Sequence, residues 1–332
     1  MTKEIEKNML RERAKKLPEV TEELWKQVDQ GHRDLVTEFL EVNTFRDKTR
    51  IQYTSALKQF FYWVHHSLND KPLYKITKRD FLRYLSFLKN RGMSSSGQAL
   101  KKAAVSSLNN YIENIVSEDD EQYEKFRNFT RGLPSIPKTQ TYDKVKVTYE
   151  EYLDIMKVLE SDENYLAMAW VATAFNVGAR RAEIIQFKTE IIDYVVPEGQ
   201  NYVMAHKVWG KGGGEGKPLD YMVNLDAIKY MKLWIEKRGY DCEYIFSTNY
   251  GGNPKQMSES WADYLCSDVL SDILGRRINP HIFKASAVTY LVDIKKVPIE
   301  IVSKYVAHHN DISTTLKFYD LRDFEEERNK IF

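Results

Sequence analysis

The sequence predicts a mainly α-helical protein with a small antiparallel β-sheet, that is, an α+β chain. Apolar residues recur at helical spacing over most of the 332 residues. The period shortens towards two only between residues 191 and 223, where strands are expected. The length allows about two domains. A segment around residues 132–141, which contains two prolines, is the expected break between them.

The first part of the chain is expected to be entirely helical. Residues 1–30 mix charges of both signs and predict a helical N-terminal extension, interrupted near Pro18. Residues 31–134 predict a helical domain of their own. Its four expected helices cover residues 34–40, 49–61, 78–89 and 96–115.

The second domain is expected over residues 148–332, after a linker at 135–147. It opens with Thr148 and Glu151, which form a capping box ahead of an apolar-periodic helix. A second helix follows and ends at Gly178. Strands are expected at 191–196, 202–208 and 218–223, the last two joined by the glycine-rich run 210–216, and helices from residue 225 onwards.

The composition excludes several classes of protein. With 42% hydrophobic and 29% charged residues, the chain fits a globular fold and not a disordered one. No apolar run approaches the roughly 20 residues that span a bilayer, and the charged N-terminus lacks the apolar core of a signal peptide. Cys242 and Cys266, the only cysteines, make neither a disulfide framework nor a zinc site. We expect an intracellular, reduced protein without a membrane partner.

The net charge of +1 argues weakly against nucleic acid as a partner, but the charges are segregated. Between residues 89 and 110 the chain has four cations and no acidic residue. Phosphate contacts depend on the local field, so these residues are candidates for DNA binding. A solvated helix face explains them equally well. The four cations are Lys89, Arg91, Lys101 and Lys102.

Two short patterns have simpler explanations than the ones they first suggest. The run 210–218 is not a phosphate-binding loop, because Lys211 and Pro218 stand where that motif needs glycine and Ser or Thr. A flexible β-turn that carries a lysine fits better. His308 and His309 are neighbours that would point about 100° apart on a helix, and no carboxylate stands at ligand spacing, so no metal site is expected.

Several residues suited to phosphodiester chemistry follow one another along the second domain. Gly178-x-Arg180-x-x-Glu183 comes first, then the Gly-Lys-Gly turn at 210–212. His281-x-x-Lys284 follows, and His309 precedes Tyr319 by 319 − 309 = 10 residues. Each piece alone has an ordinary structural explanation, but the order resembles the catalytic domain of the tyrosine recombinases, the integrases of phages and mobile elements. In that family the pattern is Gly-x-Arg-x-x-Glu, a β-hairpin lysine, His-x-x-Arg, Gly-His and a tyrosine nine or ten residues later.

The resemblance covers residues 148–332 at the level of motifs and residues 31–134 more loosely, by architecture. It implies a helical core-binding domain followed by a tyrosine-recombinase-like catalytic domain. It also implies double-stranded DNA as the partner and a homotetramer on DNA. The expected location is the cytoplasm, bacterial or of a host cell, in association with the nucleoid. No metal or other cofactor is implied, because a covalent protein–DNA link conserves the bond energy.

Carried over to this chain, the resemblance makes Tyr319 the nucleophile that forms a 3′-phosphotyrosyl link and frees a 5′ hydroxyl. Arg180 would hold two non-bridging phosphate oxygens with its planar fork. Lys211 would donate a proton to the leaving 5′ oxygen. Lys207 and Lys217 are alternatives for that role, because glycine-rich hairpins can shift register.

The remaining roles include two departures from the family. Glu183 would orient the arginine or a histidine, and His281 would bind phosphate or assist proton transfer from Tyr319. Lys284 stands where the family has arginine, which keeps the charge but loses the bidentate fork. His308 stands at the family's glycine position; His309 is the expected functional histidine because of its spacing from Tyr319, with His308 as the alternative.

The sequence therefore predicts a site-specific DNA recombinase or integrase. Two alternatives stay open: a DNA-binding member weakened in catalysis by Lys284, and relaxation of DNA in the manner of a type IB topoisomerase. Residues 321–332 are expected to form an amphipathic helix that packs on its own domain or on a neighbouring protomer.

Overall fold

The computed structural model describes residues 17–137, 145–210, 216–322, 324, 328 and 331, with the side chain of His206 excepted. The described residues form two compact units, which divide between residues 137 and 145. In the part of the chain that is described, no helix is both long and apolar enough to cross a bilayer. Each unit has its own hydrophobic core.

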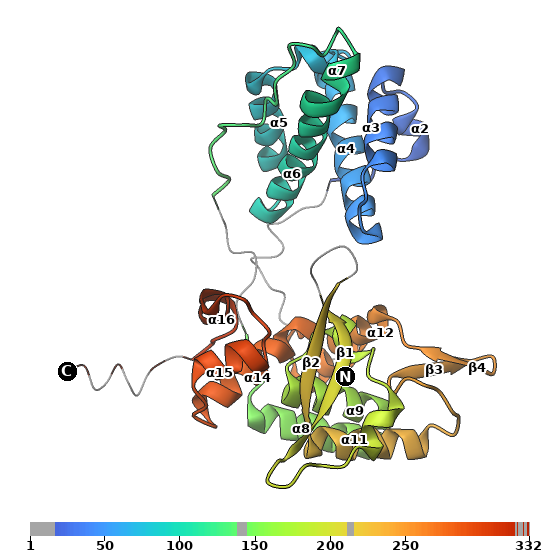
Figure 1. Cartoon of the computed structure of the whole chain (residues 1–332), viewed down its shortest axis with the longest axis vertical. Coiled ribbons are helices and arrows are strands. Elements are labelled where there is room, and N and C mark those ends of the chain that lie inside the picture. The colour runs from blue at the N-terminus through green and yellow to red at the C-terminus, as the bar shows by residue number, and fades with distance from the viewer. Residues whose placement is uncertain are drawn as a thin grey trace. The chain divides into compact units, whose positions relative to one another are not determined.

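The first unit is helical throughout (Figure 1). All four expected helices are present, and three of them begin at a residue whose side chain accepts a hydrogen bond from a free backbone N–H group, whereas the helix that begins at Asp47 has no such cap. Asp29 caps one helix through the N–H of His32, and Thr77 and Asp80 form a complete capping box on another. The elements are α2 (Glu22–Trp25), α3 (Gln30–Val42), α4 (Asp47–Leu68), the 3₁₀ turn η1 (Leu73–Lys75), α5 (Lys78–Asn90), α6 (Ser95–Tyr111), the π-helical turn η2 (Ile112–Val116) and α7 (Ser117–Asp119).

Aromatic rings fill the core of this unit. Phe60 of α4 lies edge-on to Phe81 and Tyr84 of α5, with ring centroids 5.8 and 5.1 Å apart. Trp25 is also buried in this core, and α2 contacts α4. The stretch that follows Pro18 therefore packs as part of the helical unit.

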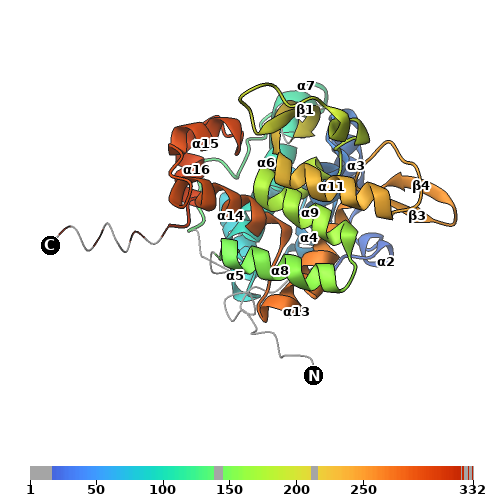
Figure 2. The ribbon, with the colours of Figure 1, turned by 90° about the horizontal axis from the view of Figure 1, so that it is seen from below.

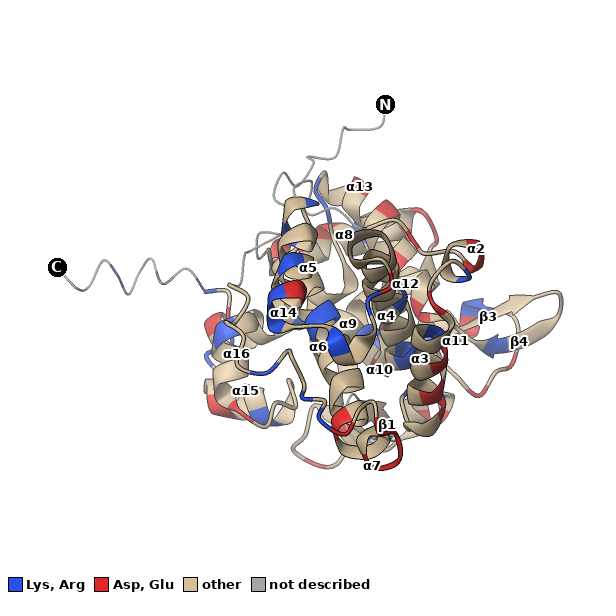
Figure 3. Cartoon of the chain, turned by 90° about the horizontal axis from the view of Figure 1, so that it is seen from above, with Lys and Arg blue, Asp and Glu red and all other residues tan. Residues whose placement is uncertain are grey.

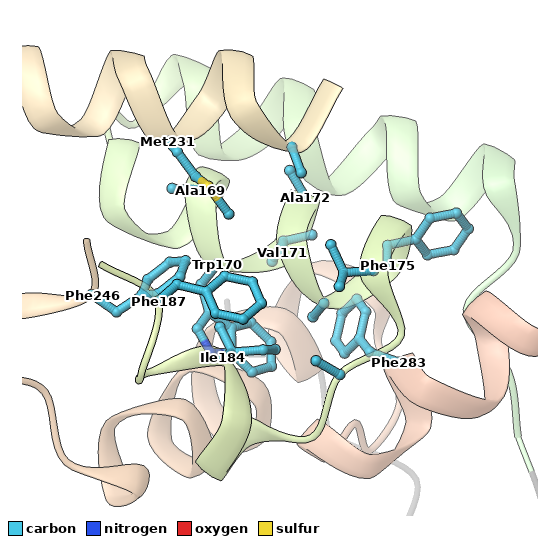
Figure 4. Close-up of a cluster of buried hydrophobic side chains, with 14 of the residues drawn as sticks. Ala169, Trp170, Val171, Ala172, Phe175, Ile184, Phe187, Met231, Phe246 and Phe283 are labelled. Atoms are coloured by element: carbon cyan, nitrogen blue, oxygen red, sulfur yellow. The ribbon is translucent and has the colours of Figure 1, made fainter. Parts of the chain in front are cut away.

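The second unit surrounds one buried helix, α9 (Tyr165–Val177). Ten of its residues are buried on all sides, as expected for a helix enclosed by others. It packs against α8, α11 and α14, which lie beside it in Figure 2. Figure 4 shows the core at this point, where Trp170 of α9 meets Phe283 of α14 edge to face at 5.5 Å. The helices of this unit are α8 (Tyr149–Ser161), α9, α10 (Arg181–Ile184), α11 (Leu225–Lys237), α12 (Glu259–Tyr264), α13 (Ser271–Leu274), α14 (Pro280–Asp293), α15 (Ile299–Tyr305) and α16 (Ile312–Phe318), with the turns η3 (Thr189–Asp193) and η4 (Leu265–Leu270).

Two antiparallel hairpins supply the β-structure. Strands β1 (Tyr202–Gly210) and β2 (Lys217–Asn224) pair from Tyr202 opposite Asn224 to Gly210 opposite Lys217, as the sequence predicts. A bulge between Ala205 and Val208 interrupts the register, and Lys207 within it has a positive φ of 60°. The second hairpin joins β3 (Ser247–Tyr250) to β4 (Asn253–Gln256).

One expected strand is wrong. Residues 191–196 do not pair with a neighbour: η3 covers the first three, and Val195 is 88% exposed. Alternating apolar residues form a strand only when another strand offers hydrogen bonds, and here Ile191 alone is buried. The fold class is nevertheless confirmed: the described chain is mainly helical with small antiparallel sheets.

Candidate active site

A sharp turn after α9 determines the position of Arg180. Gly178 ends the helix at φ 68°, and a Cβ there would lie 3.0 Å from Val306 and 3.3 Å from Ala287. The next helix, α10, begins at once with Arg180 at its N-cap. The backbone N–H of Arg180 donates to Oε2 of Glu183 at 2.7 Å, which fixes the turn.

Glu183 holds the guanidinium group of Arg180 in place. It is 2% exposed and accepts hydrogen bonds from Nη1 of Arg180 at 2.9 Å and from the hydroxyl of Tyr221 at 2.6 Å. Burial alone would raise the pKa of Glu183, but Lys284, Tyr221 and Arg180 lower it overall. The arginine is therefore held by a charged carboxylate, with its side chain still 29% exposed.

Helix α14 contributes the next two residues from one face. His281 and Lys284 lie one turn apart in the first part of this helix, which is capped by Asn279 and has Pro280 as its first residue. Burial and the nearby cations Arg180 and Lys284 lower the pKa of His281, which favours the neutral ring. Lys284 is completely buried, and its Nζ has no hydrogen-bond partner among the described residues. Burial first, then Arg180, lower the pKa of Lys284 to about 7, against the attraction of Glu183.

The two adjacent histidines have different surroundings. His308 has a φ of 54°, a conformation that glycine adopts without strain, and its ring lies edge-on to Tyr221 at 4.6 Å. His309 lies 4.6 Å from the ring of Tyr319, and its Nδ1 is 2.8 Å from Oγ1 of Thr315. Burial, and then the charge of Lys284, lower the pKa of both histidines to about 4. The histidine that contacts the tyrosine is thus His309.

Tyr319 lies at the end of α16 with its hydroxyl inside the cluster. The hydroxyl is 3.1 Å from Nε2 of His281, and the residue is 6% exposed. Thr289 of α14 donates to the Tyr319 carbonyl at 3.0 Å, which fixes the backbone as well. The structure therefore brings together six of the seven expected catalytic side chains: Arg180, Glu183, His281, Lys284, His309 and Tyr319.

The hairpin lysine that the sequence favoured, Lys211, lies outside the described residues. Of its two alternatives, Lys217 donates through Nζ to Oδ1 of Asn310 at 3.1 Å, beside the histidine turn. Lys207 lies exposed in the β1 bulge. The mouth of the hairpin is close to the cluster, because a Cβ on Gly210 would lie 3.3 Å from Oε1 of Glu183.

The four basic residues proposed for DNA binding differ in exposure. Lys89 and Arg91, at the end of α5, are exposed. Lys102 is partly buried and donates to the carbonyl of Pro134 at 3.4 Å. Lys101 is only 8% exposed, and burial lowers its pKa to about 8. Its ammonium group therefore lies largely away from solvent.

Sequence reasoning missed two arginines on α5 that lie with Arg91 on one helix face. Arg79 and Arg83 line a hollow on the surface of this helix, together with Phe87 and Arg91. The four residues are spaced by four, so they follow one another along the helix. Figure 3 shows lysines and arginines on α5 and α6. The spacing was readable from the sequence, whereas the contact of Tyr221 with the site was not.

Comparison with known proteins points to phage integrases and recombinases. A family model described as "Phage integrase, N-terminal SAM-like domain" matches residues 33–118. The chain is 75% identical over 332 residues, 100% of both chains, to the SPbeta prophage-derived recombinase-like protein YomM of Bacillus subtilis (strain 168).

Solved structures share the fold at low identity. A lambda integrase dimer bound to a COC′ core site matches with a TM-score of 0.64 and 16% identity, over 90% of this chain and 97% of that one. XerH recombinase bound to a palindromic difH substrate matches with a TM-score of 0.63 and 15% identity, over 96% and 98%. The Tn1549 transposon integrase with circular intermediate DNA matches with a TM-score of 0.62 and 14% identity, over 91% and 98%.

Proposed function

This chain belongs to the tyrosine recombinase family, and from that premise we propose that it is a site-specific recombinase. It cleaves and rejoins duplex DNA through a 3′-phosphotyrosine intermediate. The observation that carries the proposal is the hydroxyl of Tyr319, 3.1 Å from His281 in a cluster with a clamped arginine. The alternatives, relaxation by a type IB topoisomerase-like enzyme and DNA binding without catalysis, gain no support from the recombinase and integrase similarities.

The cluster is suited to the charge that develops at phosphorus. Arg180 offers a guanidinium that Glu183 already orients, so two N–H groups can meet two non-bridging phosphate oxygens without reorganisation. Nδ1 of His309 lies 2.8 Å from Oγ1 of Thr315, and its Nε2 is buried and has no partner among the described residues. Nε2 can donate to a third phosphate oxygen once the ring is protonated, a state that the negative charge of a bound phosphate favours. Phosphoryl transfer depends mainly on such positioning and charge stabilisation.

The nucleophile has a proton acceptor within reach. The lowered pKa of His281 keeps its ring neutral near pH 7, and its Nε2 lies within hydrogen-bond distance of the Tyr319 hydroxyl. As Tyr319 attacks, its oxygen bonds to phosphorus and its proton passes to His281. The bond from phosphorus to the 5′ oxygen breaks, and that oxygen takes a proton from a lysine of the hairpin, for which we propose Lys211, with Lys207 and Lys217 as the alternatives. A 5′ hydroxyl from another strand reverses the steps and releases Tyr319.

DNA binding beyond the site would involve the first unit. The α5 row, Arg79, Arg83, Phe87 and Arg91, offers three guanidinium groups along one exposed face, with charge and spacing suited to phosphates. The proposal includes a homotetramer on two duplexes, since recombination exchanges strands between partners. It also places the protein in the cytoplasm, where chromosomal and phage DNA are accessible.

The test is a covalent-adduct assay. Fragments bound by the protein are selected from random duplex DNA, and a nick is placed beside the bound site so that cleavage becomes irreversible. We expect an adduct with the wild-type chain and none with Tyr319→Phe. Tyr305→Phe is the matched control, because this tyrosine of α15 is 46% exposed and has no place in the cluster. If the bound duplex yields no adduct with any of the three, the enzyme assignment is wrong and the binding-only alternative takes its place.

A further inference from the structure

The hydroxyl of Tyr221 is a buried donor that no step of the proposed reaction uses. The residue is completely buried in β2, where it lies opposite Ala205 of β1. Its hydroxyl donates to Oε2 of Glu183 at 2.6 Å. Burial first, and then the charge of Glu183, raise the pKa of Tyr221, so this hydroxyl keeps its proton and remains a donor.

The ring of Tyr221 is held by two other parts of the chain. His308, in the turn before α16, lies edge-on to it with ring centroids 4.6 Å apart. Phe187, a buried residue that follows α10, packs against it at 6.0 Å and an interplanar angle of 56°. In a close-packed interior, a ring with such neighbours cannot swing its hydroxyl away from Glu183 without disturbing them. The position of the donor is therefore fixed before DNA binds.

Tyr221 gives Glu183 an anchor that is independent of Arg180. The carboxylate accepts two other hydrogen bonds, from the backbone N–H of Arg180 at 2.7 Å and from its Nη1 at 2.9 Å. Both come from the residue that the carboxylate has to orient. Among the described residues, the Tyr221 hydroxyl is thus the one hydrogen-bond donor that ties Glu183 to a different part of the chain. Without this hydroxyl, the carboxylate and the guanidinium can turn together.

Resting on the proposed function, we propose that Tyr221 is a positioning residue for strand cleavage, which acts through Glu183 to hold Arg180 against the scissile phosphate. It contacts no reacting atom itself. Two N–H groups of a guanidinium meet two phosphate oxygens only over a narrow range of orientations, so the anchor decides how well the charge is stabilised. Tyr221 also belongs to the hairpin that contains Lys211, the proposed proton donor. One side chain therefore links the hairpin of the proton donor to the arginine that binds phosphate.

The test uses two nicked duplexes that differ at one non-bridging position of the scissile phosphate. One carries the natural oxygen; the other carries a methyl group, which removes the negative charge that a guanidinium stabilises. Tyr221→Phe removes only the hydroxyl and keeps the ring. At saturating protein, we expect this variant to form the Tyr319 adduct on the charged duplex ~10- to ~10²-fold more slowly than wild type. On the methyl-substituted duplex, its rate should lie within about threefold of the wild-type rate.

Two further variants isolate the link to Arg180. Arg180→Ala should show a similar pattern, with a larger loss on the charged duplex. Adding Tyr221→Phe to it should slow cleavage no further, because both changes act through one interaction. Tyr240→Phe is the matched control, because this hydroxyl donates to the carbonyl of Ser247 at 2.9 Å in the same unit and not to a residue of the cluster. This control should cleave both duplexes at the wild-type rate.

Each contrary outcome overturns a different part of the reasoning. If Tyr221→Phe loses the same factor on both duplexes, the hydroxyl supports the fold and does not position Arg180. If it cleaves the charged duplex as fast as wild type, the hydrogen bond has no part in cleavage. If wild type forms no Tyr319 adduct on either duplex, the proposed function itself fails. Circular dichroism checks that each variant folds; if Tyr221→Phe does not, Glu183→Gln tests the same link and should show the loss on the charged duplex alone.

Discussion

Replacing Lys284 with methionine should stabilise the free protein. The two side chains are similar in length, so methionine can occupy the same enclosed space. The substitution removes a buried cation, and no described residue accepts a hydrogen bond from that cation. A substitution that removes a proposed catalytic group is thus expected to raise the free energy of unfolding.

The magnitude follows from the pKa of Lys284, which falls from 10.5 to about 7 on folding. At ~1.4 kcal/mol per tenfold change in proton affinity, the charged form costs roughly 4 to 5 kcal/mol in the fold at or below pH 7. Glu183 loses a neighbouring cation in the variant, which offsets part of the gain. We therefore expect the free energy of unfolding to rise by about 2 to 4 kcal/mol at pH 7.

The gain in stability of the methionine variant over wild type should decrease as the pH rises. Because folding lowers the pKa of Lys284, the unfolded chain binds more protons than the native chain between pH 7 and 10.5. The wild type therefore becomes more stable as pH rises through this window, by up to ~1.4 kcal/mol per pH unit. Methionine lacks this contribution, so the difference between the two proteins should shrink towards pH 10.

Urea denaturation at several pH values between 6.5 and 9.5 measures this difference. The relevant transition is that of the unit that contains Trp170, since the two units have separate cores. Lys217→Met is the control, because Lys217 is exposed and its removal should change stability little at any pH. A methionine variant less stable than wild type at pH 7, or a difference that does not vary with pH, would refute the reasoning.

Three further predictions concern the residues around Lys284. Tyr221→Phe removes the hydroxyl that donates to Glu183 at 2.6 Å; the free energy of unfolding should fall by about 1 to 3 kcal/mol, and urea denaturation with no loss would contradict the role given to this bond. His308→Gly should keep adduct formation, because φ is 54°, whereas His309→Ala should slow it about 10²-fold; equal losses in single-turnover assays would mean that the two histidines are wrongly assigned. Glu183→Gln should be less stable than wild type at pH 7. Because the pKa of Glu183 lies below its ordinary value of 4.5, the stability it contributes is present above that value and is lost as pH falls through the lowered pKa. A gap in thermal stability between wild type and Glu183→Gln that stays constant down to pH 3 would exclude this.

Local signals predicted most of the fold. Helix α9 was identified from its apolar pattern and Gly178, and the Thr148 cap marked the start of α8. The β3–β4 hairpin was missed, although Gly251 and Gly252 at its turn are a typical hairpin signal. Its strands carry exposed polar residues and no alternation, so periodicity gave no indication of them.

The site shows the same division between local and distant information. His281 and Lys284 are three residues apart on a helix, so their shared face was predictable. The hydrogen bond from Tyr221 to Glu183 spans 38 residues. The complete burial of Lys284 likewise depends on how α14 packs, and a sequence pattern contains no information on either. Most of the cluster could be listed from motifs, but the state of its charges could not.

The backbone clamp on Tyr319 has a consequence for assemblies of this chain. Its carbonyl is tied to Thr289, and its hydroxyl meets His281 of the same polypeptide. If Tyr319 is the nucleophile, as proposed, each subunit supplies its own and has no need of the tyrosine of a neighbouring subunit. When Tyr319→Phe chains are mixed with Arg180→Ala chains, neither should complement the other. In mixtures with wild type, the cleaved fraction should follow the share of intact subunits linearly.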